Sequence, residues 1–292
     1  MIETASLVNA YVASLEARRI PFNTLKAYRG DLHRFVTIMP GDLGTITASE
    51  IESYLSAGGV SVATCRRRHA CLRSFYQWLM LHEYLDASPM DRLVMGKTPE
   101  REPRPLPEDQ VALVLAAIPP SKTRDRALFT LLYETGMRIS EALGMQYADL
   151  DLTADDEKVR VLGKGGRERT VLLTAAPVSI RLLRRHLKKM KITSGSVSRG
   201  DVRYGGSNLP LDYSVAHYAW QKYCAAAGVT ATIHQLRHSR ATLLIKAGVP
   251  LTTVRKLLGH RNIQSSLIYA DVDQETVKHD LLQYQRSQAK RR

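Results

Sequence analysis

The sequence predicts a mainly α-helical protein of two domains with one small β-hairpin. The chain has 292 residues, and at about 100 to 200 residues per domain this length suggests two domains. Apolar residues recur at helical spacing along most of the chain. Alternation of apolar and polar residues is confined to the two sides of Gly163-Lys164-Gly165-Gly166, which predicts a hairpin with a lysine at its tip.

The first domain is predicted to cover residues 1–95 and to be helical throughout. Asn23 is suited to cap one helix, and Thr47 with Glu50 has the spacing of a capping box at the start of another. A further helix should begin near Ser61. These signals describe a small module of consecutive helices.

The helix after Ser61 carries three arginines that turn away from its apolar stripe: Arg66, Arg67 and Arg73. A solvated charged face explains them, and so does a stripe that faces DNA. The sequence leaves both interpretations open.

A proline-rich connector is predicted at residues 96–107. Its four prolines and alternating charges cannot continue a helix and favour an extended linker. Residues 1–95 hold 10 Lys and Arg against 9 Asp and Glu, whereas the rest of the chain holds 32 against 19. Nearly all of the positive charge therefore belongs to the second domain, predicted at residues 108–292.

The sequence argues against a membrane-spanning or secreted protein and favours one that binds a polyanion. The formal charge of +14 favours a polyanionic partner, and charge alone fits DNA, RNA or an anionic membrane. The sequence has no apolar run of transmembrane length and no signal-peptide start, so we expect a cytoplasmic protein. Its three cysteines form no Cys-x-x-Cys pair and are interpreted as small buried hydrophobes.

The pattern of the second domain predicts its elements in order. Helices are expected at 107–118 and 123–135, the second ended by Gly136, and a short helix should carry 138–143. The hairpin strands are expected at 158–162 and 167–173, followed by helices at about 177–190, 213–227, 234–247, 251–258 and 274–288.

Two familiar sites are ruled out. The glycine-flanked Lys164 is not a P-loop, because a P-loop has four residues between its glycines and then Gly-Lys-Ser/Thr. His234 and His238 have the spacing of a zinc-binding helix, but Gln235 stands where a metalloprotease needs its glutamate, and Arg237 would repel a metal ion.

Several short stretches concentrate basic and nucleophilic groups along the second domain. In order they supply Arg138, Lys164, His234 with Arg237, His260 and Tyr269, and they include Leu236-Arg237-His238-Ser239 and Arg255-Lys256-Leu257-Leu258-Gly259-His260. Together they closely resemble the tyrosine recombinase family, also called the phage integrase family. Arg240 and Ala270-Asp271 depart from the usual pattern without removing any of the six groups.

The resemblance implies a helical, SAM-like core-binding domain and a tyrosine recombinase catalytic domain that together form a C-shaped DNA clamp. It assigns Tyr269 as the nucleophile that gives a 3′-phosphotyrosyl link, and Lys164 as the general acid for the leaving 5′-oxygen. Arg138 and Arg237 would grip the scissile phosphate.

The remaining groups have supporting roles in the resemblance. His234 and His260 would hydrogen-bond the phosphate or help move the nucleophile's proton, and Glu141 would orient the site. Tyr284 is a competing nucleophile, but its place on the apolar stripe of the last helix favours a structural role. Two arginines can stabilise a phosphate without a metal, so no cofactor is expected.

The resemblance also implies partners. They are double-stranded DNA with an inverted-repeat recombination site and a homotetramer on two duplexes, with a paralogous recombinase as an option and no membrane. The C-terminal helix would dock on a neighbouring subunit or pack on its own domain. The chain looks like a compact, bacterial, Xer-like recombinase at the nucleoid, serving chromosome dimer resolution or a mobile element.

Two other functions compete with this prediction. A non-catalytic regulator would use the helix-turn-helix pattern around Gly248. A type IB topoisomerase would share the nucleophile chemistry but relax supercoils as a monomer.

Overall fold

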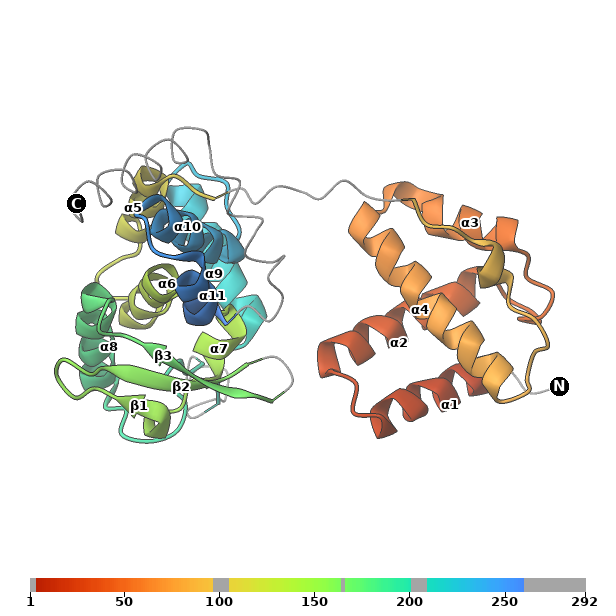
Figure 1. Cartoon of the computed structure of the whole chain (residues 1–292), viewed down its shortest axis with the longest axis horizontal. Coiled ribbons are helices and arrows are strands. Elements are labelled where there is room, and N and C mark those ends of the chain that lie inside the picture. The colour runs from red at the N-terminus through yellow and green to blue at the C-terminus, as the bar shows by residue number, and fades with distance from the viewer. Residues whose placement is uncertain (1–3, 97–104, 164–165, 201–208, 260–292) are drawn as a thin grey trace, which may run out of the picture. The chain divides into compact units, whose positions relative to one another are not determined.

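The computed structural model describes residues 4–96, 105–163, 166–200 and 209–259. The chain divides into two compact units, Met1–Glu100 and Arg101–Arg292 (Figure 1). Each unit has a hydrophobic core of its own. Residues 97–104 of the predicted linker and the predicted helix at 274–288 lie outside the described residues.

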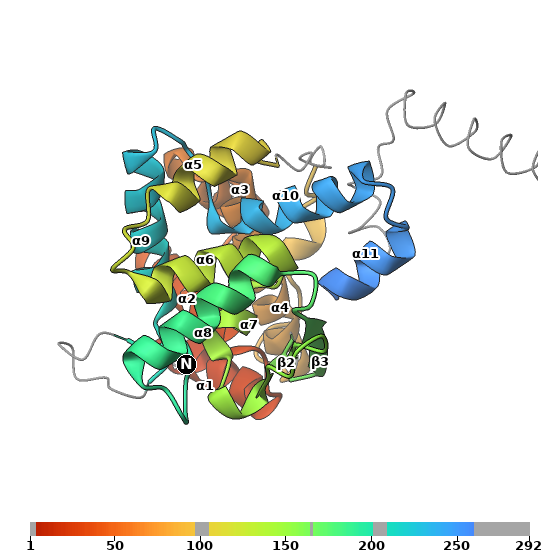
Figure 2. The same ribbon diagram turned by 90° about the vertical axis from the view of Figure 1, so that its left-hand side faces the viewer.

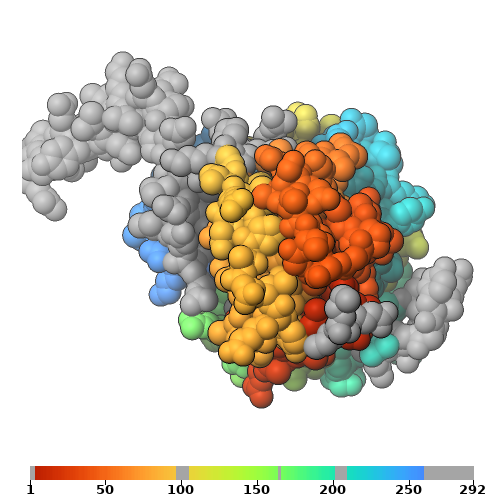
Figure 3. Space-filling model, turned by 90° about the vertical axis from the view of Figure 1, so that its right-hand side faces the viewer, coloured from red at the N-terminus to blue at the C-terminus, as the bar shows by residue number. Residues whose placement is uncertain are grey.

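The first unit is helical, as predicted. Its helices are α1 Thr4–Ala17, α2 Phe22–Ile38, α3 Ala48–Ser56 and α4 Val62–Leu81, with short 3-10 turns at Ala57–Gly59 and Pro89–Arg92. Aromatic rings fill the core, where Phe35 packs edge-on against Tyr54 and Tyr76. In Figure 3, the amber atoms of α4 and the segment after it lie beside the orange atoms of the helices before it.

The helix starts of this unit follow the sequence with one exception. Thr47 and Glu50 form the capping box before α3, and the Ser61 hydroxyl accepts a hydrogen bond from the Thr64 N–H at the start of α4. The predicted cap at Asn23 is wrong: the N-cap is Pro21, two residues earlier, and Asn23 lies in the first turn of α2. Pro21 has no side chain that can cap the helix, but its carbonyl accepts the first hydrogen bonds, from the N–H groups of Thr24 and Leu25.

The three arginines of α4 that were expected to turn away from its apolar stripe do not form one face. Arg66 and Arg73 are exposed, but Arg67 forms an ion pair with the buried Asp31 of α2 and donates a hydrogen bond to the Ala27 carbonyl. The expectation that Arg67 turns toward solvent is therefore corrected. A buried carboxylate needs a cationic partner, and Arg67 supplies it together with a longer 3.9 Å ion pair from Arg68.

The second unit is mainly helical around a small sheet, as predicted. Its helices are α5 Glu108–Ala116, α6 Thr123–Thr135, α7 Ile139–Gly144, α8 Pro177–Met190, α9 Tyr213–Ala226, α10 Ile233–Lys246 and α11 Leu251–Leu258. The strands are β1 Leu150–Asp151, β2 Lys158–Leu162 and β3 Glu168–Leu172, and they pair antiparallel in the order β1-β2-β3. The predicted hairpin is β2 with β3, in a register that places Val159 opposite Val171.

Helices α6 and α8 lie side by side and antiparallel (Figure 2). The backbone N–H of Ser179, early in α8, bonds to Glu134 near the end of α6, while Thr123 at the start of α6 contacts His186 late in α8. Helix α10 packs on the other side of α6 (Figure 2). The C-terminal end of α6 is thereby fixed between α8 and α10.

Two further expectations concern cysteines and membranes. Cys71 and Cys224 are buried and Cys65 is partly buried, as expected for small hydrophobes. Among the described residues, no helix has both the length and the apolar character needed to span a membrane.

Candidate active site

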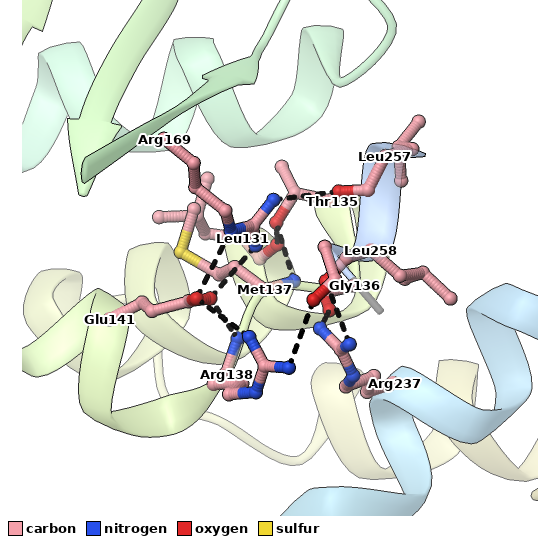
Figure 4. Close-up of polar contacts among 11 residues, drawn as sticks. Leu131, Thr135, Gly136, Met137, Arg138, Glu141, Arg169, Arg237, Leu257 and Leu258 are labelled. Atoms are coloured by element: carbon pink, nitrogen blue, oxygen red, sulfur yellow. Dashed lines mark hydrogen bonds and ion pairs between the residues drawn. The ribbon is translucent and has the colours of Figure 1, made fainter. Parts of the chain in front are cut away.

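The C-terminal ends of α6 and α11 meet at one guanidinium. Arg237 of α10 donates from Nη1 to the carbonyl of Gly136 at 2.6 Å and from Nη2 to the carbonyl of Leu258 at 2.8 Å (Figure 4). The last carbonyls of a helix have no partner inside it and attract cations. Arg237 is only 3% exposed, and both of these acceptors are uncharged carbonyls.

Gly136 permits this close approach. It ends α6 in the left-handed region with φ +64°, where a side chain is strained. A Cβ at this position would lie 2.5 Å from Cδ2 of Leu258. The predicted helix-ending glycine therefore also brings two helix ends together.

Arg138 lies at the start of α7, two residues after the end of α6. Its backbone N–H donates to Glu141 Oε2 at 2.7 Å, its Nη1 donates to Glu141 Oε1 at 3.0 Å, and its Nη2 donates to the Gly259 carbonyl at 3.2 Å. About a third of its side chain remains exposed, at 32%. Arg138 is therefore anchored along one edge and open to solvent along another.

Glu141 is the buried anion of the site. Its side chain has no exposed surface, and it also accepts from Arg169 of β3, at 3.1 Å from Nε and 2.8 Å from Nη2. Burial alone would raise the pKa of Glu141, but the hydrogen bonds and charges of Arg169 and Arg138 outweigh it and hold the pKa below its usual value. Glu141 is thus ionised and orients both arginines.

His234 lies in the first turn of α10, one turn before Arg237, as its three-residue spacing predicts. Its ring meets that of His238 edge-on, with centroids 4.5 Å apart. Desolvation and the charges of Arg237 and Arg138 lower the pKa of His234. A neutral imidazole is able to accept a proton at neutral pH.

The structure brings three of the six predicted site residues together: Arg138, His234 and Arg237. The other three, Lys164, His260 and Tyr269, lie outside the described residues. The described residues just before two of them border the site. A Cβ on Gly163 would lie 3.7 Å from Glu141 Oε1, and the Gly259 carbonyl accepts from Arg138.

Sequence reasoning missed Arg169. Its signal was present: Arg169 and Val171 are alternate residues of β3 and face the covered side of the sheet, while the other three residues of the strand are exposed. A charged residue at a strand position that faces the apolar, covered side of the sheet indicates a buried partner of opposite charge. That partner is Glu141.

The arrangement suits an oxyanion. Guanidinium groups offer paired, charge-assisted hydrogen bonds to phosphate or carboxylate oxygens and stabilise negative charge as it develops. Within the ranges that the structure describes, no three His, Cys, Asp or Glu side chains group as metal ligands. The groups that remain for chemistry are cationic arginines beside a neutral imidazole.

Comparison with known proteins identifies relatives for both units. Residues 104–276 match the model of the phage integrase family, and residues 8–83 match the phage integrase N-terminal SAM-like domain. "Tyrosine recombinase XerC" of Rhodospirillum centenum is 36% identical over 273 residues, covering 87% of this chain and 78% of the relative. "Tyrosine recombinase XerC" of Xanthomonas campestris is 30% identical, covering 92% and 85%.

Solved structures share the fold. XerH recombinase bound to palindromic difH substrate has a TM-score of 0.71 at 22% identity, covering 92% of this chain and 84% of that one. A lambda integrase dimer bound to a COC′ core site has a TM-score of 0.75 at 20% identity, covering 92% and 77%. At such low identity these likenesses show the fold alone.

Proposed function

This chain belongs to the phage integrase family of tyrosine recombinases, and on that premise we propose that Arg138, Lys164, His234, Arg237, His260 and Tyr269 form its active site. The protein is a site-specific DNA recombinase that cuts and rejoins strands through a tyrosine intermediate. The observation that carries the assignment is the convergence of Arg138 and Arg237 on the ends of α6 and α11.

The cleavage step follows from these groups. The Tyr269 oxygen attacks the scissile phosphorus, a 3′-phosphotyrosyl bond forms, and the bond to the 5′-oxygen breaks. Lys164 gives its proton to that oxygen, which leaves as a hydroxyl. Arg138 and Arg237 bind the non-bridging oxygens, where negative charge grows in the transition state.

The imidazoles handle the nucleophile's proton. Tyrosine has an ordinary pKa of about 10, so it must lose its proton to attack at neutral pH. The lowered pKa of His234 keeps its ring neutral and able to accept a proton or a hydrogen bond, and His260 is the second candidate. The ester keeps the energy of the broken bond, so a second 5′-hydroxyl reseals the strand without ATP.

The substrate in this proposal is double-stranded DNA with inverted half-sites. The name of one structural relative describes XerH on a palindromic site, and another describes a lambda integrase tetramer on a Holliday junction. We extend both features to this chain: a homotetramer on two duplexes, with the C-terminal segment linking subunits. The protein would then act at the bacterial nucleoid, on chromosome dimers or on a mobile element.

The competing functions lose support. A regulator would need none of the six groups, and the XerC relatives carry the name of a recombinase rather than of a topoisomerase. A recombinase is therefore the function that the family match and the site favour together.

A trapping experiment tests the assignment. The protein is incubated with a library of nicked duplexes of random sequence, in which the short cleaved fragment diffuses away and leaves the covalent adduct trapped. Tyr269→Phe should bind DNA but give no adduct that resists denaturant, whereas the matched variant Tyr284→Phe should give the wild-type yield. An adduct formed by Tyr269→Phe moves the nucleophile elsewhere, and sequencing the trapped DNA identifies the site.

A further inference from the structure

Arg169 links three separate elements of the second unit. It lies on β3, and its Nε and Nη2 donate to the two carboxylate oxygens of Glu141 in α7, at 3.1 and 2.8 Å. Its Nη1 donates to the carbonyl of Leu257 near the end of α11, at 2.7 Å (Figure 4). One side chain thus joins the hairpin, the carboxylate beside Arg138 and the helix that leads to His260.

These contacts differ from an ordinary surface ion pair. The Arg169 side chain is 17% exposed and that of Glu141 is 0% exposed. A two-pronged contact between guanidinium and carboxylate fixes both distance and orientation. An exposed ion pair, in contrast, leaves both side chains free to move and contributes little.

Gly259 leaves room for Arg169. A Cβ on Gly259 would lie 3.0 Å from Cδ and 3.1 Å from Nε of Arg169, and its φ of +68° is itself unfavourable for other residues. Because the glycine has no side chain, the Arg169 side chain packs directly against the end of α11. The carbonyl of the same glycine accepts a hydrogen bond from Arg138, so both arginines anchor this helix end.

We propose that Arg169 is a positioning residue for the recombination reaction. It keeps Glu141 ionised and fixed, and through Glu141 and the end of α11 it sets the orientation of Arg138 and of the chain that leads into His260. The proposal rests on the proposed function, because the reaction it concerns is the one assigned to Arg138.

The charge balance explains why a second cation matters. Glu141 is shared by Arg138 and Arg169, so neither guanidinium is fully neutralised by it. Without Arg169, the carboxylate would rest on Arg138 alone and would draw that side chain inward, away from a bound phosphate. Glu141 would also lose the strongest interaction that favours its ionised form, so it would protonate at a higher pH.

The variants Arg169→Met and Arg169→Lys separate charge from geometry. Arg184→Met is the control for an exposed pair, because Arg184 of α8 also joins a carboxylate to a carbonyl, those of Glu157 and Leu152, but its side chain is 50% exposed. The substrate is a nicked duplex of the sequence recovered in the trapping experiment. The readouts are the single-turnover rate of adduct formation at a saturating concentration of this duplex from pH 4 to 9, and the affinity for the duplex.

We expect Arg169→Met to slow adduct formation about 10- to 100-fold, the scale of a small misplacement of reacting groups, with affinity within about twofold of wild type. The acidic limb of its pH profile should move to higher pH. Arg169→Lys retains the charge but not the two-pronged contact, so its acidic limb should stay near that of the wild type while its rate falls.

Two results would overturn the proposal. One is an Arg169→Met profile that matches Arg184→Met in rate and acidic limb; the other is a lower melting temperature with no change in either, which would make Arg169 structural only. If Arg169→Met does not fold, a wild-type rate in Arg169→Lys overturns it. If the wild-type protein forms no adduct, the proposed function is contradicted as well. If the wild-type protein forms the adduct and the Arg169 variants form it at the same rate, only this inference is contradicted.

Discussion

The guanidinium of Arg237 donates a 2.6 Å hydrogen bond to the carbonyl of Gly136, although 101 residues separate them in the sequence. The contact holds the buried cation at the end of α6, where Arg138 follows two residues later. Two arginines from distant parts of the chain are thereby brought to one place, an arrangement suited to binding an oxyanion.

Loss of Arg138 should cost catalysis more than stability. Arg138→Ala removes a partly exposed guanidinium, so we expect cleavage of the trapped duplex to slow by about 10²-fold or more, the usual scale for a lost transition-state donor. The single-turnover rate of adduct formation measures this. Arg181→Ala, an exposed site on α8, is the control, and an unchanged rate in Arg138→Ala would remove this residue from the active site.

Gly136→Ala should lower the free energy of unfolding of the second unit by more than the strain of an alanine at positive φ alone. Gly228 has nearly the same φ, +67° against +64°, but a Cβ there meets nothing within 4 Å, whereas at Gly136 it meets Leu258. The extra loss in the free energy of unfolding should be about 1 to 3 kcal/mol, typical of overpacking. Urea unfolding of Gly136→Ala and Gly228→Ala measures the difference. Equal losses would show that the end of α11 shifts to make room for the new Cβ without lowering the free energy of unfolding.

The free energy of unfolding should fall as the pH drops from 6.5 to about 4. Burial, His234 and Arg237 together lower the pKa of His238 from 6.5 to about 4. The unfolded chain therefore binds more protons than the folded chain in this window, and acid favours unfolding. His238→Phe keeps a ring against His234 but does not titrate, so its urea midpoint should vary less with pH. An identical slope in both proteins would contradict the assignment.

In the first unit, Arg67 and Arg73 should respond differently to truncation. Arg67→Ala leaves the buried Asp31 with only the longer 3.9 Å ion pair to Arg68, so we expect a loss of about 1 to 3 kcal/mol in the free energy of unfolding. Arg73 is exposed, and Arg73→Ala should leave stability unchanged.

DNA binding completes the test of these arginines. If Arg73 faces DNA, its truncation should lower the slope of log affinity against log salt by about 1. Salt titrations of both variants on the trapped duplex measure this, and an unchanged slope assigns Arg73 to a solvated face.

The sequence predicts local structure well where local forces decide it. The bounds of α6, α8 and α11 match the predicted ranges because glycine or proline punctuates their ends. Strand β1 was missed, since two residues carry no periodicity and exist only by pairing with β2. Asn23 failed as a cap because Pro21 starts the helix first.

In the candidate site, too, features set by local spacing are predictable and features set by long-range pairing are not. The three-residue spacing of His234 and Arg237 predicts their shared face, and the helix places both at the site. The sequence does not indicate that Arg169 pairs with Glu141 or that Arg67 pairs with Asp31, because each carboxylate is at least 28 residues away from its arginine. Such pairings depend on how helices pack, which periodicity does not encode.

The bond between Arg138 and the Gly259 carbonyl spans 121 residues. A ribosome must therefore translate almost the entire second unit before this contact exists, and contacts of such long range form late in folding. A nascent chain that already carries Arg138 and Glu141 lacks this second anchor of the guanidinium until Gly259 has left the exit tunnel. The hydrogen bonds that hold Arg138 from both sides are therefore complete only near the end of synthesis.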